Sequence, residues 1–292
     1  MSELSALIVG CGDVGGRLAL QLLTSGWHVS GLRRSIDQLP EGVQPVAADL
    51  TDAQIPAAWP ERAPDYLVYC VAASQHDEAG YKAAYVDGLR NVLSWLQARG
   101  QQPRRLLFVS SSSVFAQQDG QWVDETAPTE PTGYSGKIML EAEQVALKSG
   151  IPASVVRLTG IYGPGREWLL SQVRQGYRVA QQPPLYGNRI HAEDAASLLA
   201  YLLAADVRGV TLEDCYIGVD DDPAPLADVV AWLREYLGVT QWSDEQRVRR
   251  TGSKRCSNAR ARALGWAPVY PSYKEGYAAI LRGGSQALGW TQ

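Results

Sequence analysis

The chain has 292 residues, with 27 basic and 31 acidic side chains and a formal net charge of -4 at pH 7. A chain of this length can bury a full hydrophobic core, as one large α/β domain or as two lobes. The near balance of charges gives no overall attraction to nucleic acid or to an anionic membrane. The four cysteines lack the spacing of metal ligands or of a disulfide framework, so we expect no metal site. We find no signal-peptide pattern and no membrane-spanning apolar run, which favours a soluble cytoplasmic protein.

A glycine-rich turn follows the first predicted strand. Leu7-Ile8-Val9 is an apolar run typical of a buried strand, and Gly10-Cys11-Gly12-Asp13-Val14-Gly15 leads from it into an amphipathic helix. Gly10 permits a sharp exit from the strand, Gly12 leaves room for a pyrophosphate, and Gly15 lets the helix pack closely on the strand. The amide groups at the positive end of the helix would then face the phosphates. The turn predicts a dinucleotide site, and the alternative is an ordinary strand-to-helix turn.

Strands and helices alternate along the first half of the chain. The sequence pattern predicts strands at residues 27–32, 43–48, 66–71, 105–109 and 153–158, and helices at residues 78–99 and 138–148. Such alternation forms a parallel sheet whose ligand edge lies at the carboxyl ends of the strands. Later the order is irregular, with helices predicted at residues 192–204, 226–237 and 271–281 and a strand at residues 215–219. We expect a sheet domain over residues 1–165, to which residues 189–219 return, and a smaller mixed α/β lobe over residues 166–292.

Short motifs follow the strands in a fixed order. They are Asp49-Leu50, Ala72-Ala73, Phe108-Val109-Ser110-Ser111 with Val114-Phe115, Val156-Arg157-Leu158, Ile161-Tyr162-Gly163-Pro164-Gly165, Arg189-Ile190-His191 with Asp194, Ser257-Asn258, and Leu264-Gly265-Trp266. In their order and spacing the chain resembles the extended short-chain dehydrogenase/reductase superfamily, and within it the NAD-dependent epimerase/dehydratase family, over nearly its whole length. The resemblance implies a Rossmann-type doubly wound parallel sheet with a smaller C-terminal substrate lobe.

The resemblance also implies where a dinucleotide would lie. Asp49 would lie beside the adenine, with Leu50 packed on its face. Together with the glycine turn, the full set of residues expected to bind the cofactor is Gly10, Gly12, Asp13, Val14, Gly15, Arg33, Arg34, Asp49, Leu50, Ala72, Ala73, Ser110 and Leu158.

The end of the second predicted strand bears on the choice of cofactor. NAD-preferring proteins place an acid there, where its carboxylate binds the adenosine ribose hydroxyls. This chain has Arg33-Arg34 and no acid until Asp37. A carboxylate would repel a 2'-phosphate, whereas two guanidinium groups can pair with it. We therefore expect NADP, with NAD as the alternative if the two arginines are only solvated loop residues.

The catalytic residues that the resemblance implies are Ser111, Tyr134 and Lys137. In the family the tyrosine is the acid/base, because a nearby lysine and the cofactor's positive ring pull its pKa toward neutrality. The lysine also binds the nicotinamide ribose, and the serine orients the reacting oxygen. Ser111 lies in a run of four serines that also suits an exposed loop.

The spacing of the Tyr-Lys pair departs from the family pattern. The family has Tyr-x-x-x-Lys, whereas this chain has Tyr134-Ser135-Gly136-Lys137, one residue short. If Lys137 is aligned, Gly133 takes the place of the tyrosine, although residues three apart on a helix are also neighbours. A second departure is Tyr85, which stands where the resemblance implies an asparagine ahead of a Gly-Thr pair; here Gly88-Leu89 follows.

Two functions remain open from the sequence. The first is an NAD(P)-binding, epimerase/dehydratase-like oxidoreductase that acts by hydride transfer on a small or nucleotide-sugar-like substrate. The second is a non-catalytic NADP-binding sensor or interaction protein that has lost the Tyr-Lys pair. The expected partner is a small-molecule substrate, with no nucleic acid and no membrane. The sequence is also compatible with a homodimer, and the helices predicted at residues 78–99 and 137–148 are candidates for its interface.

Overall fold

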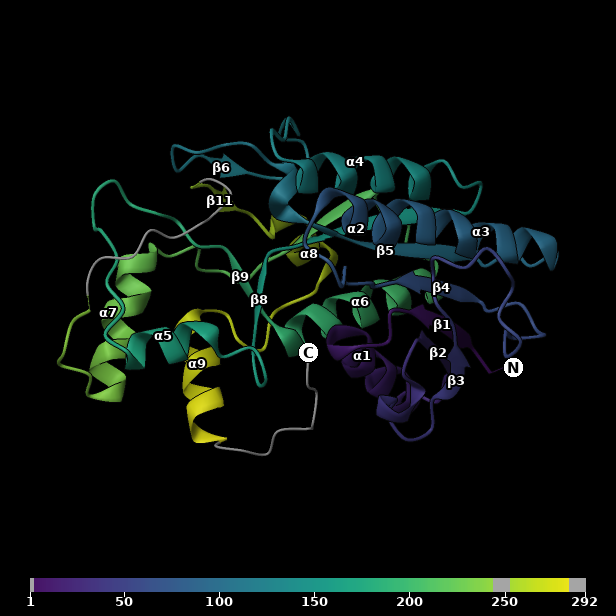
Figure 1. Cartoon of the computed structure of the whole chain (residues 1–292), viewed down its shortest axis with the longest axis horizontal. Helices are drawn as coiled ribbons and strands as arrows, with labels where there is room; N and C mark the ends of the chain where they lie inside the picture. Colours follow the sequence, from purple (N-terminus) through teal and green to yellow (C-terminus); the bar gives the residue numbers. More distant parts are fainter. Residues whose placement is uncertain (1–2, 244–252, 284–292) are drawn as a thin grey trace. The chain divides into compact units, whose positions relative to one another are not determined.

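The computed structural model describes residues 3–243 and 253–283, and these form two compact units (Figure 1). The first unit takes the described residues up to Val114, Thr129–Arg157 and Ala196–Tyr216. The second takes Phe115–Pro128, Leu158–Ala195 and the described residues from Ile217 onward. Within these residues, no helix combines the length and the apolar character needed to cross a membrane.

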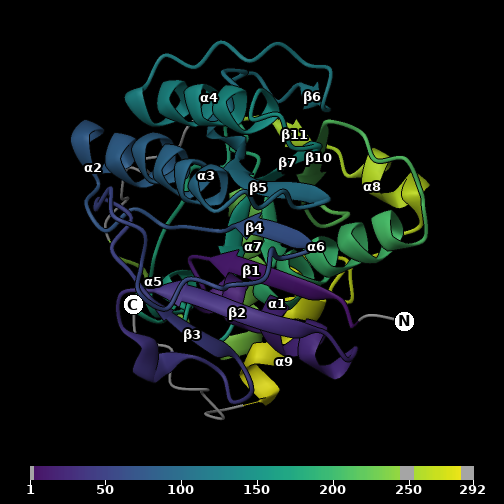
Figure 2. The ribbon, with the colours of Figure 1, turned by 90° about the vertical axis from the view of Figure 1, so that its right-hand side faces the viewer.

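A seven-stranded parallel sheet organises the first unit, as predicted. Its order is β3-β2-β1-β4-β5-β7-β10, which Figure 2 shows from β3 to β5 as a stack of neighbouring strands. The chain leaves β1 toward β2 and β3 and then returns to the other side of β1 at β4, and doubly wound sheets bind dinucleotides at such a reversal. The strands are β1 (Ser5–Val9), β2 (His28–Arg33), β3 (Gln44–Ala47), β4 (Tyr66–Tyr69), β5 (Arg105–Ser111), β7 (Ala153–Leu158) and β10 (Cys215–Gly218).

Helices cover both faces of this sheet. Figure 1 shows α3 and α4 on one face and α1 and α6 on the other. All four residues of β4 are buried, because helices cover this strand on both faces. A parallel strand in such a place is apolar throughout, without the alternation of a half-exposed strand. The helices are α1 (Asp13–Thr24), α2 (Glu78–Lys82), α3 (Gly88–Ala98), α4 (Tyr134–Leu147) and α6 (Ala192–Val207), with single 3-10 turns at Ile36–Gln38 and Ser112–Val114.

The single helix predicted over residues 78–99 is divided by a π-helical turn at Ala83–Asp87. The Tyr69 hydroxyl, from β4, donates a 2.5 Å hydrogen bond to the Ala84 carbonyl inside this turn. A Cβ at Gly88 would lie 2.7 Å from the same hydroxyl, so the helix approaches β4 closely only because this residue is glycine. Contact with the strand therefore fixes the turn, which helical periodicity in the sequence does not reveal.

The helix predicted over residues 138–148 begins earlier, at Tyr134. Gly133 is its N-cap residue, in an extended conformation, and Tyr134 to Lys137 form its first turn. A Cβ at Gly136 would lie 2.4 Å from Pro131 Cβ and 2.5 Å from the Ser113 carbonyl oxygen. Close packing thus requires glycine at position 136 in the first helical turn. In the sequence a glycine there is typical of a loop, which is why the predicted helix began too late.

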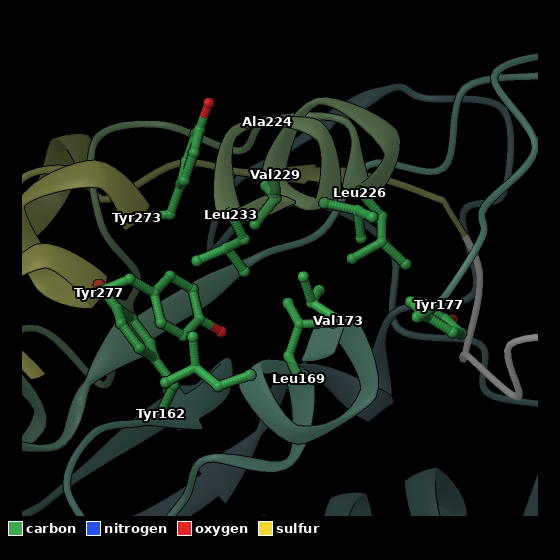
Figure 3. Close-up of a cluster of buried hydrophobic side chains, with 12 residues drawn as sticks. Tyr162, Leu169, Val173, Tyr177, Ala224, Leu226, Val229, Leu233, Tyr273 and Tyr277 are labelled. Carbon is green, nitrogen blue, oxygen red and sulfur yellow. The ribbon is translucent and has the colours of Figure 1, made fainter. Parts of the chain in front are cut away.

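The second unit has its own hydrophobic core, shown in Figure 3. Tyr162, Leu169, Val173, Leu233 and Tyr277 belong to this buried cluster, to which β8, α5, α7 and α9 contribute. The predicted helix at residues 271–281 is found as α9, after Ser272, whose side chain accepts a hydrogen bond from the Lys274 amide. The elements are β6 (Trp122–Val123), β8 (Gly160–Tyr162), α5 (Trp168–Arg174), β9 (Arg189–His191), α7 (Leu226–Leu237), β11 (Arg255–Cys256), α8 (Ala259–Leu264) and α9 (Tyr273–Arg282), with β6 paired to β11 and β8 to β9.

Candidate functional site

The three glycines of the turn after β1 have three different surroundings. Gly10 has a φ of 84°, and a Cβ there would lie 2.5 Å from the Cys70 carbonyl oxygen at the end of β4. A Cβ at Gly15 would lie 2.6 Å from the Gly10 carbonyl oxygen, so this glycine lets α1 pack against the turn. At Gly12, by contrast, no described atom beyond those of Gly12 and its adjoining chain lies within 4 Å of the Cβ position. Two glycines are needed by the fold, and the third leaves space for a ligand.

The start of α1 can receive an anion. Gly12 is its N-cap residue, and no side chain of the described residues caps it, so its first amides are suited to bind phosphate oxygens. Asp13 places a carboxylate at this end, but Arg17 Nε donates to Asp13 Oδ1 at 2.8 Å and balances its charge. Val14 is buried against the core. The turn thus leads from β1 directly into α1, whose start carries no side-chain cap among the described residues.

The Arg33 guanidinium lies against the same turn. Arg33 is the last residue of β2, and its Nη1 donates to the Cys11 carbonyl oxygen at 3.3 Å while Nη2 donates to Gln38 Oε1 at 2.5 Å. Arg34 is exposed. Burial raises the pKa of the Cys11 thiol to about 12, so this side chain is a neutral packing group at pH 7. The site thus has a positive charge where an NAD-preferring protein would have an acid.

The segments after β3 and β4 form the next part of this edge. Asp49 is exposed, and its Oδ1 accepts hydrogen bonds from the Thr51 amide at 2.9 Å and the Thr51 hydroxyl at 2.8 Å, which hold its pKa below the ordinary value. Leu50 is half-buried, and its carbonyl accepts a 2.7 Å hydrogen bond from the Asn91 side chain. Ala72 is exposed and Ala73 is buried.

Ser110 belongs to a buried polar network that the sequence reasoning missed. Its hydroxyl donates to Glu143 Oε1 at 2.6 Å. Arg157 donates to both oxygens of the same carboxylate, from Nε at 3.0 Å and from Nη2 at 2.7 Å. The network joins β5, α4 and β7. Its sequence signal is Arg157, a charged residue in the apolar run of β7, whereas Glu143 stands among the polar residues Glu141 and Gln144 and gives no such signal.

The predicted catalytic residues lie around the first turn of α4. Ser111 is the last residue of β5, half-buried, and its Oγ accepts a 3.2 Å hydrogen bond from the Ser113 amide. The close approach of Gly136 to the Ser113 carbonyl brings this segment beside the first turn of α4. Lys137 is exposed in that turn. Tyr134 is 38% exposed, and its hydroxyl donates at 2.6 Å to the His76 carbonyl. Its proton is therefore held by the backbone after β4.

Leu158, the remaining predicted residue, is the buried last residue of β7 and belongs to the second unit. Among the described residues, no group of three or more His, Cys, Asp or Glu side chains is arranged to hold a metal ion.

The chain matches a known protein family and known proteins. The family model described as NAD dependent epimerase/dehydratase matches residues 6–218. A 3-diazoavenalumate denitrifying reductase from Streptomyces sp is 26% identical over 309 residues, which cover 92% of this chain and 98% of that protein.

Two solved structures extend the comparison. One is described as an NAD-dependent epimerase/dehydratase from Methylobacillus flagellatus and is 37% identical in sequence. The match covers 97% of this chain and 99% of that chain, with a TM-score of 0.78. The enzyme WbmG from Bordetella bronchiseptica, solved in complex with NAD, has the same fold, with a TM-score of 0.76 and 17% identity over 96% of this chain and 94% of that chain. The family match spans the strands from β1 to β10 together with the glycine turn, and the chain belongs to the NAD dependent epimerase/dehydratase family.

Proposed function

We propose that this chain is an NADP(H)-dependent oxidoreductase that transfers a hydride to or from a small or nucleotide-sugar-like substrate. The observation that carries the proposal is the open space above Gly12 at the start of α1, next to the Arg33 guanidinium. Helix amides and an arginine beside one turn suit a pyrophosphate and a 2'-phosphate together. One relative is named a reductase, which supports the reaction class, and a structure of the same fold was solved with NAD, which supports a nicotinamide dinucleotide as the cofactor.

Each side of the glycine turn has a different role in this proposal. Arg33 at the end of β2 pairs with the phosphate on the adenosine ribose, and the amides of α1 bind the pyrophosphate. The other half of the dinucleotide then extends past β4 and β5, because these strands lie on the opposite side of β1 from β2. When bound there, the nicotinamide ring supplies or accepts the hydride. Ser111 and Lys137 lie beyond β5 and at the start of α4, where they can orient a substrate oxygen and the nicotinamide ribose.

Calorimetric titration with NADPH and NADH tests the cofactor assignment. We expect NADPH to bind at least about tenfold more tightly, which is about 1.4 kcal/mol. The Arg33→Asp variant should reverse the order, because a carboxylate repels the 2'-phosphate and accepts hydrogen bonds from ribose hydroxyls. Arg99→Asp is the matched control, since Arg99 is exposed beyond the C-terminal end of α3. An unchanged affinity ratio in Arg33→Asp would refute the arginine argument.

A non-catalytic NADP-binding protein is the second candidate, and the Tyr134 hydroxyl favours it. That hydroxyl donates to the His76 carbonyl, and it lies three residues before Lys137 rather than four. The two candidates are separated by incubating the protein with NADPH and a panel of carbonyl compounds and nucleotide sugars while following absorbance at about 340 nm. The oxidoreductase proposal expects protein-dependent oxidation of NADPH with at least one compound; tight NADPH binding without turnover across the panel would favour the sensor.

A further inference from the structure

Three tyrosines lie in a row at the carboxyl end of β4. The ring centroids of Tyr134 and Tyr81 are 5.5 Å apart, edge to face, and those of Tyr81 and Tyr85 are 5.3 Å apart. Tyr134 comes from α4, Tyr81 from α2 and Tyr85 from the π-helical turn. Their hydroxyl groups have different partners. The difference decides which of them can give up a proton.

The Tyr85 hydroxyl accepts a hydrogen bond instead of donating one. The Ala73 amide, just beyond β4, donates to Tyr85 Oη at 3.3 Å. The proton of Tyr85 has no acceptor among the described residues, whereas the proton of Tyr134 is directed to the His76 carbonyl. A backbone N–H that points at a phenol oxygen also favours the phenolate that remains after proton transfer. Tyr85 is therefore arranged as an acid, and Tyr134 is arranged as a structural donor.

The π-helical turn holds Tyr85 in this place. The Tyr69 hydroxyl donates to the Ala84 carbonyl, one residue before Tyr85, and Gly88 permits the close approach on the other side. Single π turns inside α-helices recur at functional sites, because they move a side chain off the helical register. Both β4 and the turn thus fix where the phenol lies.

The topology puts Tyr85 on the nicotinamide side of the glycine turn. Arg33 ends β2, on one side of β1, whereas Ala73 and Tyr85 lie beyond β4, on the other side. The turn touches the end of β4 at Cys70, as the surroundings of Gly10 show. A dinucleotide with its 2'-phosphate at Arg33 and its pyrophosphate over Gly12 must therefore extend its reactive end toward β4.

We propose that Tyr85, rather than Tyr134, donates the proton that accompanies hydride transfer, an assignment that rests on the proposed oxidoreductase function. In the reducing direction, the carbonyl carbon of the substrate receives the hydride supplied by NADPH, and the electron pair of the C=O π bond moves to oxygen. The O–H bond of Tyr85 breaks and its proton joins that oxygen, so that the carbonyl becomes an alcohol and NADP+ remains. The phenolate regains its proton from water.

The surroundings of Tyr85 define a test without a substrate. Tyr69 from β4, Cys70 just after that strand and Tyr81 from α2 are titratable groups that face it, and each is a phenol or a thiol. Burial is the main cause that raises the pKa of Tyr85, so the phenol stays protonated at pH 7. The oxidised nicotinamide ring carries a positive charge, and an opposite charge within ~4–6 Å favours the phenolate and lowers the pKa by about 1 to 3 units.

The experiment is a titration of phenolate absorbance at about 295 nm, with and without saturating NADP+, while calorimetry reports NADP+ binding. In the wild-type protein we expect NADP+ to lower the pKa of one tyrosine by about one unit or more. Tyr85→Phe should lose this shifted step and keep NADP+ affinity within about tenfold, which also shows that it is folded. Tyr81→Phe, which removes a neighbouring hydroxyl, and Tyr134→Phe should keep the step.

The other outcomes have distinct meanings. A shifted step that survives in Tyr85→Phe, or that is lost only in Tyr134→Phe, overturns the assignment of Tyr85. So does wild-type protein that binds NADP+ with no shifted tyrosine. Wild-type protein that binds no NADP+ overturns the proposed function, and the assignment with it.

Discussion

The glycine turn at residues 10–15 and the first turn of α4 place different requirements on their residues. At the glycine turn the requirement is for missing side chains: Gly10 and Gly15 are demanded by close contacts, and Gly12 leaves space open. At the first turn of α4 the requirement is that Tyr134 and Lys137 point in suitable directions. There the Tyr134 hydroxyl donates a hydrogen bond to the His76 carbonyl. Backbone contacts therefore determine the glycine turn, whereas the first turn of α4 depends on where a side-chain hydroxyl finds its acceptor.

The buried network under α4 should show the largest effect on stability. Glu143→Ala leaves the Arg157 guanidinium buried without its carboxylate, and we expect a loss of about 3 to 5 kcal/mol in the free energy of unfolding. Glu141→Ala is the control on the same helix. Its carboxylate lies 3.1 Å from Arg90 with both side chains about half exposed, so the loss should be below about 1 kcal/mol. Denaturant unfolding measures both variants, and equal losses would show that the network does not anchor α4.

The glycines of the turn should separate stability from binding. Gly10→Ala puts a Cβ against the backbone of Cys70 and Val71, just after β4, at a φ of 84°, and we expect a loss of about 2 to 3 kcal/mol in stability. Gly12→Ala meets no described atom within 4 Å beyond its own adjoining chain, so stability should change by less than about 1 kcal/mol while NADPH affinity falls at least about tenfold. Thermal unfolding and calorimetry measure the two effects. Unchanged NADPH affinity in Gly12→Ala would contradict the assignment of the open space.

Tyr134 should show the smallest effect. Tyr134→Phe removes one partly exposed hydrogen bond to the His76 carbonyl, so stability should fall by about 1 kcal/mol or less. The affinity for NADP+ should change by less than about twofold, because the proposed nicotinamide contact belongs to Tyr85. Unfolding and titration measure the two quantities. A loss of NADP+ affinity above about tenfold would mean that Tyr134 serves the cofactor after all.

The sequence predicts what local rules determine. The sheet and its helices follow from apolar periodicity, and the predicted strands at residues 27–32, 43–48, 66–71 and 105–109 are found with ends that differ by at most two residues. The glycine turn is equally readable, because its residues are adjacent in the chain. The network of Ser110, Glu143 and Arg157 and the π-helical turn held by Tyr69 depend on residues that only the folded sheet brings together. Helical spacing alone could not predict them.

A crystal structure of the protein with NADP+ would show where the dinucleotide binds and how it is oriented. We expect the pyrophosphate over Gly12 at the start of α1, the 2'-phosphate paired with Arg33, and the nicotinamide ring on the β4 side of the turn. A dinucleotide bound elsewhere, or one bound at the turn with its 2'-phosphate directed away from Arg33, would contradict this expectation.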